Sequence, residues 1–302
     1  MATYRGNLGD LYGDRLAYLE DVLFDEIKIE DGVVPSVVRV KDTDKMIVRT
    51  TTVASFGSVP IKAEGSDATF DELAQGYDKA YQPDTYELGF KTSKEALDDE
   101  QEEVISDAAR ALGQSYTFTY NTDHANLYND GFTSTTGSPD GAVIFSTAHP
   151  LIGGGNGSNT LATPADLSVQ SMRDLMNVIA DTTDDSGKLL HWRAKILLVP
   201  YELSWLAKEL VRSTGKPGTD TNDINAFQDD DLRVVAWPYL TDPDAWFLLD
   251  EPANHNLRSY TREAPNVLHD WAFISSTMLC KIRGRWVRGW SDYKRVAGSA
   301  GA

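Results

Sequence analysis

A long amphipathic stretch near the middle of the chain constrains its fold most. Thr92 and Glu95 form a Thr-x-x-Glu capping motif, and apolar residues follow at helical spacing to about Leu127. At 1.5 Å per residue, a helix over this range would be roughly 50 Å long. Gly113 and the Thr- and Tyr-rich run after it weaken the helical pattern in the second half. The predicted apolar stripe comprises Leu97, Val104, Ile105, Ala108, Ala111, Leu112 and Phe118. Such a rod exceeds what an ordinary globular domain needs.

The segments before this helix predict an arm, a hairpin and a long loop that extend from the main domain. Residues 1–30 are acidic with apolar positions at nearly helical spacing, which indicates a short amphipathic helix or arm. The β-branched runs Val37–Val40 and Met46–Val53 predict a β-hairpin. Residues 57–90 contain glycines and prolines without a sustained period, which predicts an extended or loop-rich excursion.

The segments after the helix alternate between loops, helices and strands. Gly131–Asn159 reads as a loop around a short strand at Val143–Phe145. Thr163-Pro164 predicts the start of a helix that ends before Asp184. A buried strand is expected at Lys195–Val199, and a helix follows from Leu203 to near Gly215.

The last third of the chain predicts sheet. Leu232–Ala236 and Ala245–Leu249 are expected to be strands that pair with each other. Trp271–Val296 alternates apolar and polar residues, which is typical of a sheet with one solvent-exposed face. Core packing is the favoured role of the tryptophans on or beside these strands, with an exposed interface as the alternative. They are Trp237, Trp246, Trp271, Trp286 and Trp290.

The charge balance disfavours a general nucleic-acid reader. The 302 residues carry a formal charge of -18, with 46 acidic and 28 basic side chains. The cations gather near the C-terminus, so that end of the chain could still face a polyanion. They are Lys281, Arg283, Arg285, Arg288, Lys294 and Arg295.

Cysteine content and hydropathy indicate the kind of compartment in which the chain can fold. Cys280 is the sole cysteine, so no intramolecular disulfide can form, and a reducing cytoplasm suits the chain. The N-terminal residues do not resemble a secretory signal, and no apolar run is long enough to cross a bilayer.

No motif predicts catalysis, a cofactor or a metal. Gly153–Gly157 and Gly215–Thr219 fit neither phosphate-binding register, and Asp181–Gly187 resembles a calcium loop only in its acidity. There is no GxSxG elbow, and Cys280 falls within an expected strand. The five histidines form no HExxH motif. They are His124, His149, His191, His255 and His269. We therefore expect no catalytic, cofactor-binding or metal-binding residues.

Five segments follow one another in an informative order. They are YELGFKTSKEALDDE (86–100), DGAVIFSTAHP (140–150) with the glycine loop and Ser158-Asn159 after it, LLVPYELSWLAKELVRS (197–213), Asn222–Asn225 and LRVVAWPYLTDPDAWFLL (232–249). In this order they resemble a family of structural proteins, the Mu-like major head subunits of tailed bacteriophages. The resemblance spans roughly residues 55–290 and supplies no catalytic residues.

This resemblance implies an α+β, HK97-like capsid fold. It implies an N-terminal arm, an extended β-hairpin called the E-loop, a long spine helix, and peripheral and axial domains. The implied limits are 1–34 for the arm, 35–90 for the E-loop, 91–130 for the peripheral domain with its spine helix, 131–265 for the axial domain and 266–302 for returning peripheral strands.

The function implied is that of a non-enzymatic major capsid subunit in the virion, assembled in the host cytoplasm. The implied partners are further copies in hexamers and pentamers, a portal, possibly decoration proteins, and packaged double-stranded DNA bound without sequence specificity. Some relatives begin with a helical scaffolding segment that is absent here, so we expect a separate scaffolding protein. An encapsulin-like compartment shell, a decoration or receptor-binding protein, and an acidic soluble hydrolase using His149 or His191 are the alternatives.

Overall fold

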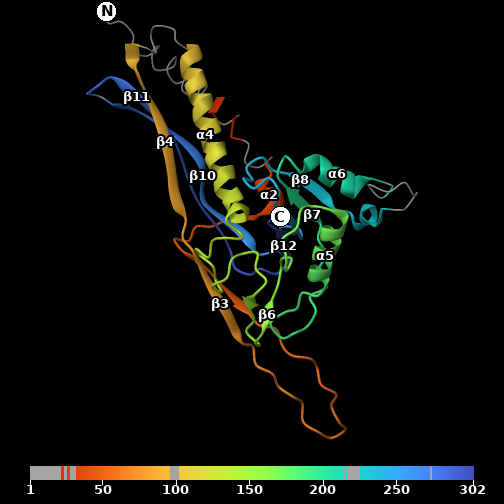
Figure 1. The fold of residues 1–302 in the computed structure, drawn as a ribbon. Helices are drawn as coiled ribbons and strands as arrows, with labels where there is room; N and C mark the ends of the chain where they lie inside the picture. Colours follow the sequence, from red (N-terminus) through yellow and green to blue (C-terminus); the bar gives the residue numbers. More distant parts are fainter. Residues whose placement is uncertain are drawn as a thin grey trace, which may run out of the picture.

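The computed structural model describes residues 22–23, 26–27, 32–95, 102–213, 215, 225–272 and 274–302. The molecule combines two four-stranded sheets, two small two-stranded sheets and a long helix, and one loop projects far from the body (Figure 1). The arm predicted for residues 1–34 and the turn predicted at Gly215–Thr219 lie almost wholly outside the described residues.

The long helix packs with one face against the larger sheet. Its strand order is β1-β10-β11-β4, with β1 parallel to β10 and the other neighbours antiparallel. The strands are β1 (Arg39–Asp42), β4 (Asp84–Ser93), β10 (Leu257–Ala272) and β11 (Thr277–Trp290). Met278, Cys280 and Ile282 are buried, whereas Leu279 and Lys281 are exposed. The alternation predicted for this part of the tail is therefore confirmed.

Helix α4 (Glu102–Asn129) begins later than its sequence suggests. Thr92 lies in β4, where it pairs with Met278 of β11, so the predicted cap at Thr92 is wrong. The predicted stripe is only partly correct, because Leu112 is buried but Ala111 and Phe118 are exposed, Phe118 at 58%. Leu97 lies outside the described residues. The buried apolar side chains and histidine of α4 are Ala109, Leu112, Tyr116, Tyr120, His124, Ala125, Leu127 and Tyr128. Gly113 is required by close packing, since a Cβ atom there would lie 2.9 Å from the carbonyl oxygen of Leu23.

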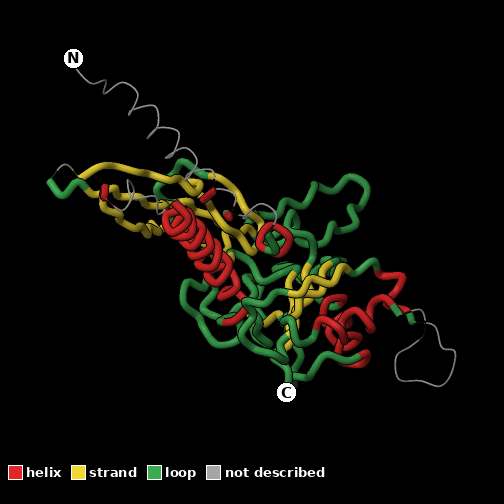
Figure 2. The backbone as a smooth tube through the Cα atoms, turned by 90° about the horizontal axis from the view of Figure 1, so that it is seen from above, coloured by secondary structure: helices red, strands yellow, loops and turns green. Residues whose placement is uncertain are grey.

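The second sheet has the strand order β12-β9-β7-β8. Its strands are β7 (Ile196–Val199), β8 (Arg233–Ala236), β9 (Trp246–Leu249) and β12 (Val296–Ser299). The predicted pairing of β8 with β9 is wrong, because the fully buried β7 lies between them. In the view from above, this sheet lies on the side of the C-terminal end of α4 (Figure 2). Ile196, Leu198 and Phe247 join the core that contains α4.

Two helices cover the other face of this sheet. They are α5 (Val169–Ala180) and α6 (Ser204–Arg212), which pack with Leu197, Val199 and Leu248 in a separate core. The strand at 196–199 and the helix after it are confirmed. The start predicted for α5 is wrong, since its N-cap is Ser168 in a capping box with Ser171.

The remaining elements are short. They are α2 (Val34–Val37), β5 (His149–Pro150), β6 (Asn156–Gly157) and the 3-10 helix η1 (Ala226–Asp230). Strands β5 and β6 form a small hairpin across the glycine run, in which Gly154 and Gly155 have positive φ angles. The short strand predicted at 143–145 is absent, and its residues Ile144 and Phe145 are buried in the loop before β5.

The strand pairing also corrects the predicted chain segments. Val37–Val40 and Met46–Val53 do not form a hairpin, because β1 pairs with β10 and β2 (Val48–Val53) pairs with β3 (Gln75–Tyr81). The strands predicted to return over 266–302 have other limits in the structure. Strand β10 starts at Leu257, and β12 leaves the larger sheet to pair with β9.

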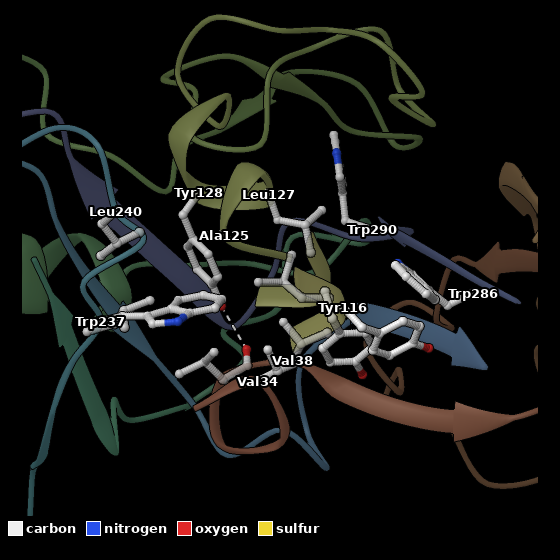
Figure 3. Packing of buried hydrophobic residues seen from close by; sticks show 14 of the residues in the cluster. Val34, Val38, Tyr116, Ala125, Leu127, Tyr128, Trp237, Leu240, Trp286 and Trp290 are labelled. Atoms are coloured by element: carbon white, nitrogen blue, oxygen red, sulfur yellow. Dashed lines mark hydrogen bonds between the residues drawn. The ribbon is translucent and has the colours of Figure 1, made fainter. Parts of the chain in front are cut away.

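An aromatic cluster holds α4 against the larger sheet. Trp286 stacks on Tyr86 with 3.7 Å between ring centroids and meets Tyr116 and Tyr120 edge-on. Its indole nitrogen donates a 2.9 Å hydrogen bond to Asp123 of α4. Figure 3 shows this core continuing from Trp286 to Tyr128, whose hydroxyl donates to the carbonyl of Val37 at 2.7 Å. Trp237, Trp246, Trp286 and Trp290 are all buried, which confirms their predicted role in the core.

A buried contact between His149 and Asp140 fixes the loop before β5. Nδ1 of His149 lies 2.7 Å from Oδ2 of Asp140, and Nε2 lies 3.2 Å from the carbonyl oxygen of Ile144. Each ring nitrogen therefore has an oxygen within hydrogen-bond distance. The ring also stacks on Tyr293, with 3.8 Å between centroids. The loop is thereby joined to the chain that follows β11.

We expect Trp286→Ala to lower the free energy of unfolding by about 3–5 kcal/mol, because it removes the stacked ring at the centre of the cluster. Leu279→Ala is the matched control, since it truncates an exposed residue of the same strand and should change the value by only about 0.5 kcal/mol. Chemical denaturation of the unassembled subunits measures both. Equal effects of the two substitutions would contradict the assignment of Trp286 to the central core.

Asp140→Ala should lower the free energy of unfolding at pH 7 by about 2–3 kcal/mol. Burial raises the pKa of Asp140, but hydrogen bonds from His149, Ala142 and Ser138 outweigh it and hold the pKa below 3.8. A depressed pKa contributes stability above the unfolded-state pKa, and this contribution is lost as the pH falls through the folded-state pKa. Denaturation at several pH values should therefore show the wild-type advantage shrinking below about pH 4. The exposed Asp130→Ala serves as control, and an advantage that persists in acid would refute this origin.

Candidate assembly surfaces

The loop between β2 and β3, residues 54–74, is the most prominent projection of the described structure (Figure 1). We call it the projecting loop. Two backbone features close it: the amide of Ala54 donates to the carbonyl of Ala74 at 2.9 Å, and the amide of Gly57 donates to Asp71 at 2.7 Å. Its large apolar side chains are open to solvent. They are Phe56 at 50% exposure, Val59 at 95%, Ile61 at 100%, Phe70 at 91% and Leu73 at 58%.

Polar contacts anchor the base of the projecting loop to the body. Ser55 bonds to Asp184 and Ser186 in the turn after α5, and the hydroxyl of Tyr77 donates to the carbonyl of Pro150 at 3.1 Å. Burial raises the pKa of Asp184, but hydrogen bonds from Ser55 and nearby backbone amides outweigh it and lower the pKa. In the sequence this turn stands out only by its acidity, whereas in the structure it holds the base of the projecting loop.

A second group of charges lies beside this base. Nζ of Lys294 lies 3.0 Å from Asp185 and 3.5 Å from Asp292. Burial lowers the pKa of Lys294, but the two carboxylates outweigh it and raise the pKa, so the ammonium stays charged. These residues border a polar hollow of about 350 Å³ together with Thr50 and Ser291. The hairpin base itself is packed on the larger sheet, because Tyr81 of β3 is buried with its ring centroid 5.1 Å from that of Tyr260. Residues 55–74 beyond it are all exposed.

The far end of the larger sheet is a second exposed apolar region. Ile274, in the turn between β10 and β11, is 99% exposed, and Leu268 and Leu279 are 40% and 43% exposed. The projecting loop and this turn belong to different extensions of the molecule. Contacts with other chains are therefore available at separate places.

The cations near the C-terminus are matched by carboxylates. Nε of Arg288 lies 2.9 Å from Asp123, and Nη1 of Arg295 lies 2.8 Å from Asp250. Nε of Arg283 lies 3.3 Å from carboxylate oxygens of both Glu87 and Glu263. Together with the Lys294 cluster, these pairs show that much of the positive charge serves the fold, which weakens the case for a polyanion site here.

The histidines proposed for an alternative hydrolase lie apart. His149 is fully buried, and its two nitrogens face Asp140 and Ile144. His191 is exposed, has a φ of 48° and borders a different hollow beside α5. The two side chains do not form a common site.

The other histidines are also separate. Nε2 of His124 lies 2.8 Å from the hydroxyl of Ser259, and burial lowers the pKa of His124 to about 4. His255 is buried, and its burial likewise lowers its pKa to about 4. His269 is exposed on β10. Within the part of the chain that the structure describes, no three His, Cys, Asp or Glu side chains come together as a possible metal site.

The described helices include none with both the length and the apolar character needed to span a membrane.

The excursion predicted at 57–90 contains most of the projecting loop, but it also includes β3 and most of β4, which are regular strands. Sequence reasoning missed Asp184 and Ser186 as the anchors of the loop, because a contact across about 130 positions leaves no local pattern in a sequence.

Comparison with known proteins gives a consistent picture. Residues 76–296 match a family model described as phage capsid protein. None of the curated proteins compared with the chain matches it.

Several solved structures share the fold. The capsid of Myoviridae phage XM1 is similar over 90% of this chain and 92% of that chain, with a TM-score of 0.57 and 12% identity. A structure from Microbacterium phage Oxtober96 covers 88% and 90%, with a TM-score of 0.54 and 11% identity. A virus-like particle from Pyrococcus furiosus covers 95% and 99%, with a TM-score of 0.56 and 9% identity.

The α+β architecture is thus HK97-like, and the chain acts as a major capsid subunit that assembles with other copies into the virion shell. The family model matches well over half of the sequence. The chain belongs to the phage capsid protein family.

Proposed function

We propose that this subunit forms hexamers and pentamers in the icosahedral head of a tailed phage, around double-stranded DNA, and that the projecting loop is the E-loop that covers a neighbouring copy. The observation that carries this proposal is the set of exposed apolar side chains on residues 54–74. Burying one such side chain contributes about 1.5–3 kcal/mol. Several on one loop can offset the entropy of fixing it against a partner. The Mu-like subfamily is the one that the sequence motifs favour.

We also propose domain limits that follow the strand pairing. The peripheral domain would comprise α4 and the larger sheet, and the axial domain would comprise the second sheet with α5 and α6. The E-loop would be limited to about residues 43–83, because β1 and β4 belong to the larger sheet. The predicted limits of 35–90 and 266–302 change accordingly, and residues 1–34 keep the proposed role of an N-terminal arm.

A separate scaffolding protein, a portal and possibly decoration proteins complete the proposed partners, with assembly in the host cytoplasm. Their support is the family resemblance alone. Uniform closed shells formed by this chain expressed alone would contradict the separate scaffold. We propose no catalytic role, and the burial of His149 supports this proposal.

An encapsulin-like compartment shell is the second candidate. The similarity to the virus-like particle from Pyrococcus furiosus favours it, whereas the family match favours a phage head. The contents of purified particles distinguish the two functions. Particles with packaged double-stranded DNA and a tail vertex support the phage head, and particles filled with a cargo protein support the compartment.

The double substitution Ile61→Ser and Phe70→Ser should prevent shell formation without unfolding the subunit. Both side chains are more than 90% exposed, so they contribute little to the isolated fold. Sedimentation and negative-stain images should show capsomers or particles for the wild type and smaller species for the variant, with equal thermal unfolding of the subunits.

The matched control is Lys62→Ser with Ser66→Ala, which changes two exposed polar residues of the same loop and should leave assembly intact. Normal particles from the Ile61 and Phe70 variant would contradict the role of the loop. A wild-type chain that remains a 33.3 kDa monomer at every concentration would contradict the capsid function itself.

A further inference from the structure

Helix α6 and the turn before it present an aromatic pair to solvent. Trp205 is 70% exposed and Tyr201, four residues earlier, is 63% exposed, whereas Ala207 and Leu210 on the other face are buried. Nζ of Lys208 lies 5.0 Å from the centroid of the Trp205 ring. We call Tyr201 and Trp205 the aromatic knob. Exposed tryptophan and tyrosine side chains are enriched at the centres of protein interfaces.

A hollow of about 460 Å³ lies beside the C-terminal half of α5. We call it the α5 hollow. Its lining is Met176, Ile179, Ala180, His191, Trp192, Arg193 and Ala194. Apolar atoms of α5 and Ala194 form much of this surface, and His191 and Arg193 are exposed. Methionine adapts to aromatic rings, and a guanidinium stacks on them, so this lining suits an indole.

The knob and the hollow lie at opposite ends of strand β7. Residues 191–194 of the hollow lead into the first residue of β7, and α6 begins five residues after the last. Figure 1 shows α5 and α6 at different heights on the same side of the molecule. Trp205 does not line the hollow of its own chain. A contact between two different patches of identical subunits is head-to-tail, and such contacts close into rings when the rotation permits.

The charges around the two surfaces are complementary. Glu202 in the turn before α6 and Glu209 on α6 lie on either side of Trp205 in the chain, with Lys208 between them, so these neighbours of the knob carry one net negative charge. The α5 hollow is lined by Arg193 and His191, and no carboxylate lines it. Opposite charges at the rims would fix the orientation of the contact.

We propose that Trp205 of one copy inserts into the α5 hollow of the next copy, and that this contact closes the axial domains into the capsomer ring. The inference rests on the proposed function, because it names the surfaces that join subunits within a hexamer or pentamer. The partner is a second copy of this chain. The contact is independent of the projecting loop, which extends from another part of the molecule.

The test is cross-linking of assembled shells that carry Trp205→Cys together with Met176→Cys. A short bismaleimide should join neighbouring copies and give a ladder of multimers, up to the closed ring, on a denaturing gel. Each single variant is a control for reaction with Cys280. Trp205→Cys with Asp244→Cys is the matched control, because Asp244 is exposed in the turn after β8, at the same end of the sheet as α6. It should give no ladder.

Trp205→Ala should raise the subunit concentration needed for assembly about tenfold or more, with unchanged subunit stability, because the side chain is exposed in the isolated chain. Particles that form without a ladder from the Trp205 and Met176 pair, or with no effect of Trp205→Ala, would overturn the knob contact and leave the capsid function intact. A wild-type chain that never assembles would overturn both.

Discussion

The packing of α4 against two sheets at once is the interaction on which this structure depends. Trp286, Tyr116 and Tyr120 join the helix to the larger sheet, and Tyr128 carries the same core to Phe247 of the second sheet. One face of α4 thus shares a single core with both sheets, while α5 and α6 pack in the separate core on the other face of the second sheet. Because aromatic rings bury large areas in fixed geometries, they suit a joint between flat elements that meet at an angle.

The sequence predicted those elements whose identity depends on their own residues. Alternation in β11 is visible because every second residue from Met278 to Trp286 is buried, and β7 is a continuous apolar run because all four of its residues are buried. Partners distant in the chain were not predictable. Thr92 has the residues of a helix cap but pairs with Met278, and β1 pairs with a strand more than 200 residues away. The order of the second sheet was missed because β7 separates β8 from β9.

The same distinction holds for the assembly surfaces. Residues 57–90 show no sustained hydrophobic period, which is enough to predict an excursion from the body. The exposed apolar side chains show that part of this segment does not bury its apolar surface within one subunit. The acidic turn that holds its base could not be predicted, because Asp184 and Ser55 meet only in the folded chain. In the sequence, Trp205 likewise cannot be told from a core residue of a helix. Only the structure shows that the opposite face of α6, with Ala207 and Leu210, is the buried one.

The course of the chain between the sheets has a mechanical consequence. It passes from α4 into the second sheet, returns through β10 and β11, and crosses again to β12. Three crossings tie the two sheets to each other, whereas residues 55–74 of the projecting loop are all exposed and are held only at their base. Differences in curvature between positions of a closed shell would then be absorbed by this loop, while the two sheets keep their arrangement.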